Sequence, residues 1–217
     1  MSITTRITRL IAQRLHENAY VERMGDRDQQ TTLEKTIYLT FDDGPHLERT
    51  PALLDNLAAL NLKATFFVLG RNMGLGKELI RRAIKEGHSV GSHSWSHWQA
   101  DKTSNRDWIE DVAKARRELE NITGRSCRLF RPPYGALTPL KLLHLIKNDY
   151  RIIHWALDTK DFEAKSPQKL KAWFENTPPI QNGIVLMHDD KEYSTRYFNE
   201  VYAPWLGKAN TAAIPMD

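Results

Sequence analysis

The chain of 217 residues contains one cysteine, Cys127. A single thiol excludes an intrachain disulfide, so the composition gives no support for a small secreted domain held together by disulfides. No apolar run approaches the ~20 residues that a membrane-spanning helix needs. Blocks of like charge are also absent, because the 31 Lys and Arg and the 27 Asp and Glu are spread along the chain, with a net charge of +4. This distribution does not indicate a nucleic-acid-binding surface.

The first twenty residues lack the continuous apolar core of a signal peptide, because Arg6, Arg9 and Arg14 interrupt it. Apolar residues recur there at helical spacing, at Ile3, Ile7, Leu10, Ile11 and Leu15. This pattern predicts a basic amphipathic helix, followed by a polar linker, within residues 1–35. We expect the helix to pack on a catalytic domain of residues 36–217, with loose binding to an anionic inner-membrane surface as the alternative. These features favour a cytoplasmic location.

After residue 35, strand-like runs alternate with amphipathic helical runs. The strand candidates are Ile37–Phe41, Ala64–Leu69, Ser89–Ser92, Arg128–Phe130, Ile152–Leu157 and Ile184–Met187. The helix candidates are Thr50–Leu60, Lys77–Glu86, Asn105–Ile122, Thr138–Asn148 and Ser166–Asn176. Strand alternating with helix predicts an α/β domain with a mostly parallel sheet, and six such units favour a barrel.

Local signals mark where several of these helices begin and end. Three starts show a capping residue followed by proline, at Thr50–Pro51, Thr138–Pro139 and Ser166–Pro167. Gly87 and Gly124 stand where two helices are expected to end. We therefore expect Thr50, Thr138 and Ser166 to be cap residues.

Titratable residues follow the ends of the predicted strands. Asp42 and Asp43 follow the first, His93 and His97 the third, Arg131 the fourth, Asp158 and Asp161 the fifth, and His188 and Asp189 the sixth. In a β/α barrel the active site lies at the carboxyl ends of the strands. Scattered acids and histidines would not follow strand ends in this way, so the pattern predicts an active site at that edge.

The histidines four residues apart in "HSWSH" and the paired carboxylates in "FDDGP" suit a metal site. On a helix or helical turn, this spacing puts His93 and His97 on one face. Two histidines and one aspartate are a common ligand set for catalytic zinc, which lowers the pKa of bound water from ~16 towards ~7. One of Asp42 and Asp43 would then be a ligand and the other a general base. An Asx-type turn with solvated carboxylates is the alternative.

Five motifs resemble, in order, those of the polysaccharide deacetylase family, also called carbohydrate esterase family four, which includes chitin and peptidoglycan deacetylases. They are TFDDGP (Thr40–Pro45), HSWSH (His93–His97), RPPYG (Arg131–Gly135), DTKDF (Asp158–Phe162) and LMH (Leu186–His188). Each motif is weak alone, but the five together are specific. The resemblance covers roughly residues 36–189 and implies a distorted (β/α) barrel with fewer than eight strands.

The resemblance implies a metal site and a general base. By that likeness, Asp43, His93 and His97 bind one divalent metal. Zinc is the favoured ion, and cobalt, nickel and manganese are alternatives. Asp42 would be the general base, and Arg131 would orient or tune it.

The resemblance also implies roles for residues near the leaving group and the acetyl group. His188 would be the general acid, and Asp161 would hold Arg131. The main-chain N–H of Tyr134 would face the oxyanion. Leu186 would line the acetyl pocket.

Pro132, Phe162 and Trp95 complete the predicted substrate-binding residues. Phe162 stands where the family usually has tryptophan, so the wall of the substrate pocket is less bulky there and lacks an indole N–H. Trp95 either stacks on a sugar face or packs in the core. The aromatic tail of residues 190–217 also departs from the family's usual final helix and apolar strand, which leaves barrel closure unpredicted.

Metal-dependent hydrolysis of an N-acetyl group on an amino-sugar-containing glycan or oligosaccharide is the function that these residues favour. A sugar O-acetyl ester or an N-formyl group is the alternative substrate, because the reacting carbonyl is alike. A barrel that binds glycans without turnover is a third interpretation. It would have no need for both the ligands and the acid–base pair. The expected partner is a carbohydrate and not a nucleic acid.

Overall fold

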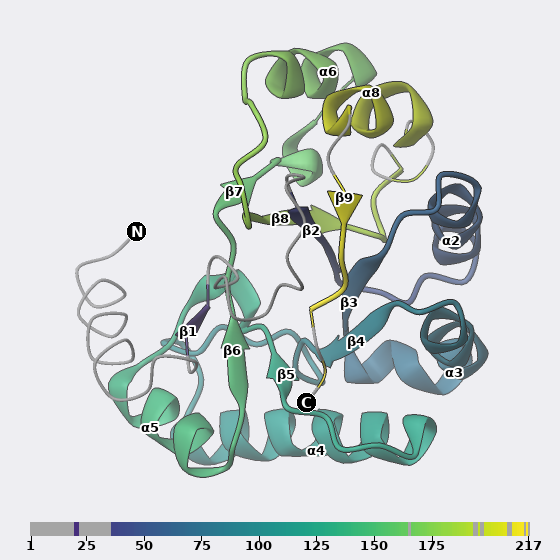
Figure 1. Ribbon diagram of the computed structural model, residues 1–217. Helices are drawn as coiled ribbons and strands as arrows, with labels where there is room; N and C mark the ends of the chain where they lie inside the picture. The colour runs from purple at the N-terminus through teal and green to yellow at the C-terminus, as the bar shows by residue number, and fades with distance from the viewer. Residues whose placement is uncertain are drawn as a thin grey trace.

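A parallel sheet curls into an open barrel in the computed structural model (Figure 1). The structure describes residues 20–21, 36–164, 166–192, 195, 198–207, 210–214 and 216. The strands are β1 (Tyr20–Val21), β2 (Thr36–Asp42), β3 (Ala64–Val68), β4 (Ser89–Ser92), β5 (Leu129–Phe130), β6 (Arg151–Ile153), β7 (Leu157–Asp158), β8 (Ile184–His188) and β9 (Asn210–Thr211). Their order is β1-β6-β5-β4-β3-β2-β8-β7, and β9 pairs with β2. In this order, the seven neighbouring strands from β6 to β7 form the main part of the curved sheet. This confirms the predicted distorted barrel with fewer than eight strands.

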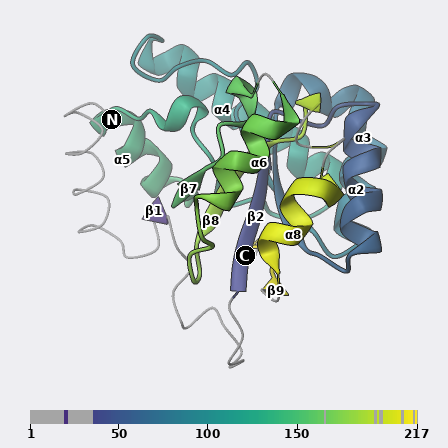
Figure 2. The ribbon, with the colours of Figure 1, turned by 90° about the horizontal axis from the view of Figure 1, so that it is seen from above.

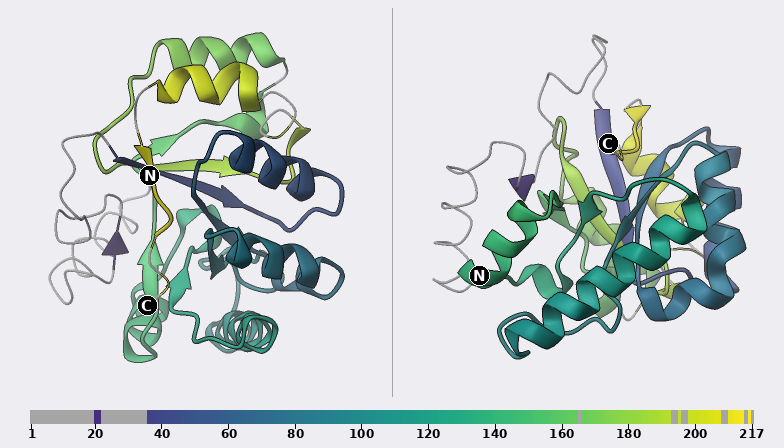
Figure 3. Two further views of the ribbon diagram at one scale, coloured as in Figure 1. Left: turned by 45° about the vertical axis from the view of Figure 1, so that its right-hand side comes forward. Right: turned by 90° about the horizontal axis from the view of Figure 1, so that it is seen from below.

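Helices cover the outside of this sheet (Figures 1 and 3). They are α2 (Arg49–Ala59), α3 (Gly70–Lys85), α4 (Asn105–Thr123), α5 (Pro139–Lys147), α6 (Pro167–Glu175) and α8 (Ala203–Leu206), with short turns η2 (Pro133–Gly135), η3 (Asp161–Glu163) and η4 (Phe198–Tyr202). Each strand–helix–strand unit returns the chain parallel to its start. The strands' carboxyl ends therefore gather at one edge.

Side chains that alternate along the strands fill two apolar layers. Phe66 of β3 packs outward with Leu53 and Ile80 of the covering helices. Its neighbour Phe67 points inward, where it packs with Tyr38 and Ile153. Successive residues of a strand face opposite sides, and both sides are covered here, so β2 and β3 read as nearly continuous apolar runs.

The predicted strand Ile152–Leu157 is two strands, which corrects the sequence interpretation. β6 ends at Ile153, and the His154 N–H donates to the Val21 carbonyl of β1. Two residues later, the Ala156 N–H donates to the Ile184 carbonyl of β8, and β7 begins at Leu157. The chain thus crosses the barrel's opening between its two edges, which apolar patterning alone does not reveal.

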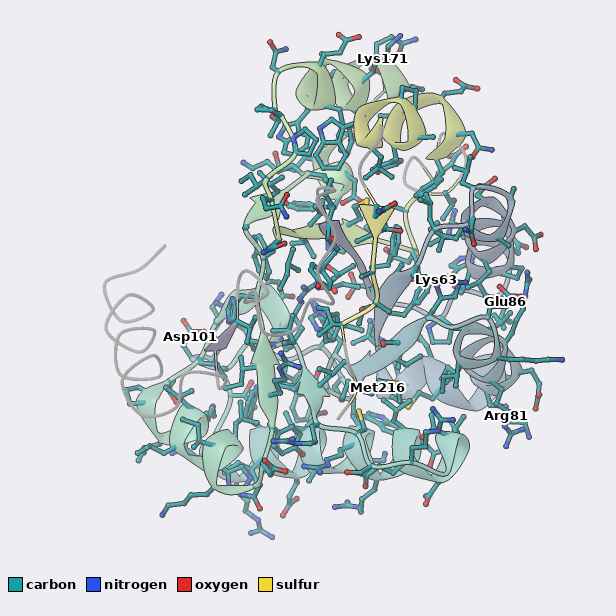
Figure 4. All side chains as sticks on the ribbon, in the orientation of Figure 1. Lys63, Arg81, Glu86, Asp101, Lys171 and Met216 are labelled. Atoms are coloured by element: carbon teal, nitrogen blue, oxygen red, sulfur yellow. The ribbon has the colours of Figure 1, made fainter. Side chains whose placement is uncertain are left out.

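The C-terminal tail covers the end of the barrel opposite the strands' carboxyl ends. β9 pairs with the start of β2, and Ile214 is fully buried in the inner apolar layer. The Ile214 N–H donates to Thr65 Oγ1, and the Val90 N–H to Met216 Sδ. Figure 2 shows β9 beside β2 from above, and Figure 4 shows Met216 near β4. The unusual tail is therefore part of the fold.

Two helix starts differ from their predictions. α3 begins at Gly70, seven residues before the predicted Lys77. α2 begins at Arg49, so Thr50 lies inside its first turn instead of capping it. The Ser166 cap is confirmed by its bond from the Lys169 N–H.

The predictions for residues 1–35 stay predictions, because the structure describes only Tyr20 and Val21 there. Tyr20 and Val21, inside the predicted segment 1–35, pair with β6 and so belong to the sheet. The predicted amphipathic helix lies outside the described residues, and the cytoplasmic location stays a prediction. None of the helices in the described part of the chain is both long enough and apolar enough to span a membrane.

Candidate active site

A pocket of about 400 Å³ opens at the carboxyl ends of the strands. Its lining residues are Asp42, Asp43, His93, His97, Pro132, Tyr134, Trp155, Asp158, Phe162, Leu186, His188 and Lys191. They come from the ends of β2, β4, β5, β6, β7 and β8 and from the loops that follow. Residues that follow the strand ends in the sequence thus lie around one cavity.

Three of these side chains form a candidate metal site. The Asp43 Oδ1 atom lies 3.7 Å from His93 Nε2 and 3.4 Å from His97 Nε2. One ligand atom from each residue can be chosen so that all three lie within 4.8 Å of one another. Ligands about 2.1 Å from a tetrahedral zinc ion lie roughly 3.4 Å apart, so these three fit one ion.

The unpaired atoms of this cluster also fit a metal. Asp43 Oδ1 is buried and accepts no hydrogen bond from the described residues. His93 Nδ1 lies 2.7 Å from the Arg131 carbonyl oxygen, so this nitrogen carries the proton and donates. In a neutral imidazole with this tautomer, the lone pair of His93 Nε2 is directed at the cluster. Metal-binding histidines typically donate their other ring N–H to a carbonyl or carboxylate oxygen in this way.

The two histidines lie on a loop, which corrects the predicted helical turn. His93 follows the end of β4, and no helix is formed between it and His97. The loop turns through left-handed residues, with φ of 69° at Ser94 and 61° at His97. Asp43 is also left-handed, with φ of 74°. Such non-glycine residues cost free energy and cluster at functional sites.

Charges around the cluster favour the protonation states that metal ligands need. Burial opposes ionisation of Asp43, but the nearby His93, His97 and His188 outweigh it and lower the pKa of this carboxyl. Burial and the neighbouring His93 lower the pKa of His97, against the opposing charges of Asp43 and Asp42. An ionised Asp43 beside a neutral His97 is a suitable donor pair.

Asp42 is held by a buried arginine. Arg131 is fully buried, and its Nη1 donates to Asp42 Oδ1 at 2.8 Å and to Thr40 Oγ1 at 2.6 Å. Its other guanidinium nitrogens donate to the carbonyls of Ile153 and His154. Asp42 Oδ2 lies 3.7 Å from His93 Nε2, on the metal-site side. Arg131 thus orients the carboxylate that the family resemblance implies is the base.

Asp161 holds His188, whereas the family resemblance implied that it would hold Arg131. Its Oδ1 lies 2.6 Å from His188 Nδ1, and its Oδ2 accepts the His188 main-chain N–H at 2.7 Å. Burial alone would lower the pKa of His188. The hydrogen bond and charge of Asp161, with the charges of Asp42 and Asp43, raise it to about 9. His188 is therefore protonated at neutral pH.

The pocket wall contains most of the predicted substrate residues. Pro132, Tyr134, Phe162 and Leu186 line it, whereas Trp95 is outside the described lining. Trp95 packs against Gly70, where an added Cβ would lie 2.4 Å from its ring, and Lys114 Nζ lies 3.5 Å from the ring centroid. Trp95 thus shows the packing that was one of its two predicted roles, and a stacking contact with a sugar stays a prediction.

Three other residues also line the pocket. Asp158 ends β7, and its strand-end position had already predicted it at this edge, without a specific role. Trp155 and Lys191 were not predicted, and Trp155 lies in the chain crossing between β6 and β7, so its place depends on the split strand. Lys191 follows β8 by three residues and pairs with Asp190 at 2.6 Å.

Comparisons with known proteins match this geometry. A family model described as polysaccharide deacetylase matches residues 29–153, more than half of the chain. The peptidoglycan-N-acetylglucosamine deacetylase PgdA of Listeria monocytogenes is 38% identical over 159 residues, 71% of this chain. This chain spans only 32% of that protein's length. A chitooligosaccharide deacetylase of Azorhizobium caulinodans is 33% identical over 168 residues, covering 76% of this chain and 79% of the relative.

Solved structures agree with the sequence relatives. The crystal structure of the Bc1960 peptidoglycan N-acetylglucosamine deacetylase has a TM-score of 0.81 and 26% sequence identity. The match covers 94% of this chain and 94% of that chain. With the barrel, the family-model match and the Azorhizobium relative in agreement, this chain belongs to the polysaccharide deacetylase family.

Proposed function

We propose that this protein is a metal-dependent deacetylase that hydrolyses N-acetyl groups on amino sugars of a glycan. The observation that carries the proposal is the arrangement of three groups around one pocket. The Asp43–His93–His97 cluster, the Arg131-bound Asp42 and the Asp161-bound His188 all face it. This arrangement combines a ligand set with separate base and acid groups.

A divalent cation bound by Asp43, His93 and His97 would polarise the acetyl carbonyl and lower the pKa of a water molecule. Asp42 lies beside this cluster and accepts the proton that the attacking water loses. Its other oxygen stays bonded to Arg131, so the free Oδ2 is the one available. The tetrahedral oxygen would be stabilised by the Tyr134 main-chain N–H.

The leaving nitrogen needs a proton, and His188 supplies it. Asp42 and His188 occupy the same register on the adjacent strands β2 and β8, so base and acid lie side by side. Asp161 fixes Nδ1 of His188, which leaves Nε2 to donate. Water adds to the carbonyl carbon, the C–N bond breaks, and the products are acetate and a free amine.

The substrate class comes from the relatives and from the pocket. The names of two relatives specify peptidoglycan N-acetylglucosamine and chitooligosaccharides as their substrates. Phe162 and Trp155 give the pocket two aromatic faces, which suit a sugar ring. An N-acetylglucosamine-containing glycan is therefore the proposed substrate, with a sugar O-acetyl ester as the alternative.

The test is acetate release from a panel of N-acetylated oligosaccharides, polymeric chitin, peptidoglycan and O-acetylated sugars. The protein is stripped with a chelator and then reloaded with zinc, cobalt, nickel or manganese. We expect release from the N-acetylated glycans that depends on added metal. Equal release from stripped and reloaded protein would contradict metal dependence. Acetate release from the O-acetylated sugars alone would mean that the substrate is a sugar O-acetyl ester and not an N-acetyl amide.

A further inference from the structure

A buried carboxyl group beside the pocket has no role in the proposed chemistry. Asp189 follows His188 and is only 1% exposed. Its main-chain N–H donates to the Asp42 carbonyl at 3.1 Å. Its Oδ2 accepts a hydrogen bond from Thr50 Oγ1 at 2.7 Å. Burial, together with the charges of Asp190 and Asp43, raises the pKa of Asp189 to about 8.

The contacts of Asp189 converge on the loop 42–46, which carries the proposed base and a metal ligand. Thr50 Oγ1, which donates to Asp189, also accepts the His46 main-chain N–H at 2.7 Å. The loop is thus held at its first residue by the Asp189 N–H and at its last residue through Thr50. These bonds link β8 and α2 to a turn whose left-handed Asp43 costs free energy.

The middle of the loop is shaped to the same carboxyl group. A Cβ built on Gly44 would lie 2.0 Å from Asp189 Oδ2 and 2.4 Å from its Cγ. Gly44 is not among the left-handed glycines, so its backbone does not call for glycine. Its missing side chain makes room for Asp189. Substitution at Gly44 is therefore expected to displace either the loop or the carboxyl group.

We propose that Asp189 and Thr50 are positioning residues that hold the loop 42–46 so that Asp42 and Asp43 both face the pocket. Gly44 provides the space that the Asp189 carboxyl group fills. The inference rests on the proposed function for the roles of the two aspartates. It assigns neither Asp189 nor Thr50 a contact with substrate or metal.

The first test compares Thr50→Val with Thr50→Ser. Valine keeps the shape but removes the hydroxyl that joins His46 to Asp189, whereas serine retains it. Changes behind metal ligands typically weaken metal affinity by roughly 10-fold to 100-fold. We expect about 10-fold weaker zinc binding and a lower kcat at saturating zinc in Thr50→Val, with most of both restored in Thr50→Ser. Zinc affinity is measured by competition with a chromophoric chelator.

The second test uses Gly44→Ala alone and with Asp189→Ala. The single change should weaken zinc binding more than Thr50→Val does, because the methyl group meets the carboxyl group. Removing that group should let the double variant bind zinc more tightly than Gly44→Ala alone, a coupling that a double-mutant cycle measures. A double variant that is no better than Gly44→Ala would overturn the proposed fit. The Thr50 pair remains informative if Gly44→Ala does not fold.

Thr65→Val is the matched control. The Thr65 hydroxyl is equally buried and accepts the Ile214 N–H at the opposite end of the barrel. Thr65→Val should lower thermal stability but leave zinc affinity unchanged. The positioning role is wrong if Thr65→Val weakens zinc binding as much as Thr50→Val, or if Thr50→Val binds zinc like the wild type. If the wild type binds zinc but releases no acetate, the proposed function fails, while zinc affinity still decides the positioning role.

Discussion

The two ends of the barrel are built differently from the same strands. At the carboxyl end, the chain leaves β2 and β4 through left-handed residues and places carboxylates and imidazoles around a cavity. At the opposite end, β9 and Ile214 seal the interior with backbone pairing and apolar packing. Strain and unpaired polar atoms destabilise the first end, whereas burial stabilises the second. Catalysis and stability are thus expected to respond to different substitutions.

Asp42→Asn should have the largest effect on catalysis, and it should also lower stability because buried Arg131 loses its counter-charge. A general base typically contributes ~10²–10⁴-fold in rate, and Asp42 is not one of the three proposed ligands. We expect that loss in kcat with bound zinc nearly unchanged. Metal analysis and acetate release on the same preparation measure both. Loss of the metal with an unchanged rate per bound metal would mean that Asp42 and Asp43 exchange roles.

Ile214→Ala tests the other end. Ile214 is fully buried in the inner apolar layer, and truncation of such a side chain costs about 2–5 kcal/mol. We expect this loss in the free energy of unfolding, with zinc affinity retained at temperatures where the protein is folded. Leu75→Ala is the control, because Leu75 is 84% exposed. A large fall in zinc affinity in folded Ile214→Ala would show that the two ends are coupled.

Asp161→Asn should lower the pKa of His188. In the metal-free protein, NMR should show the His188 imidazole titrating near pH 9. This pKa is above the ordinary value of 6.5, so the interaction of protonated His188 with Asp161 stabilises the folded state. The stabilisation is complete below about pH 6.5 and is lost as the pH rises through 9. Asp161→Asn should remove this decline in stability. An unchanged His188 titration in the variant would mean that Asp161 does not control it.

Phe162→Trp should have the smallest effect. Phe162 is 48% exposed in the pocket and meets the His188 ring edge-on, with centroids 5.4 Å apart. A larger aromatic face adds about 0.5–1.5 kcal/mol at most, which is roughly a 2-fold to 10-fold change. We expect a lower KM for oligosaccharides and little change in kcat. A fall in kcat would indicate that the indole disturbs His188.

The sequence predicted the site better than the connections that build it. Asp42, His93 and His188 were found because the carboxyl ends of parallel strands lie at one edge of the sheet. This arrangement does not depend on the conformation of the loops. The early start of α3 was missed because Gly70, Gly74 and Gly76 disfavour a helix locally. An added Cβ on Gly76 would lie 2.2 Å from Pro45, so packing explains that glycine.

The partner of Asp161 was missed for a different reason. Motif order places Asp161 and Arg131 at the same edge but does not say which neighbour each carboxylate reaches. The structure brings Asp161 within 2.6 Å of His188 Nδ1, while Arg131 bonds to Asp42. Side-chain pairing depends on the path of the chain between β6 and β7. The sequence pattern presented that path as one strand.

The pairing of β2 with β8 also determines when the site can form. Thr40 and Val185 are joined across 145 residues of sequence, and the same ladder sets Asp42 beside His188. Contacts this distant along a chain are slow to establish during folding. Base and acid therefore meet only after most of the polypeptide has been synthesised and ordered. Recovery of acetate release on refolding would report the completion of the sheet, later than signals from its local helices.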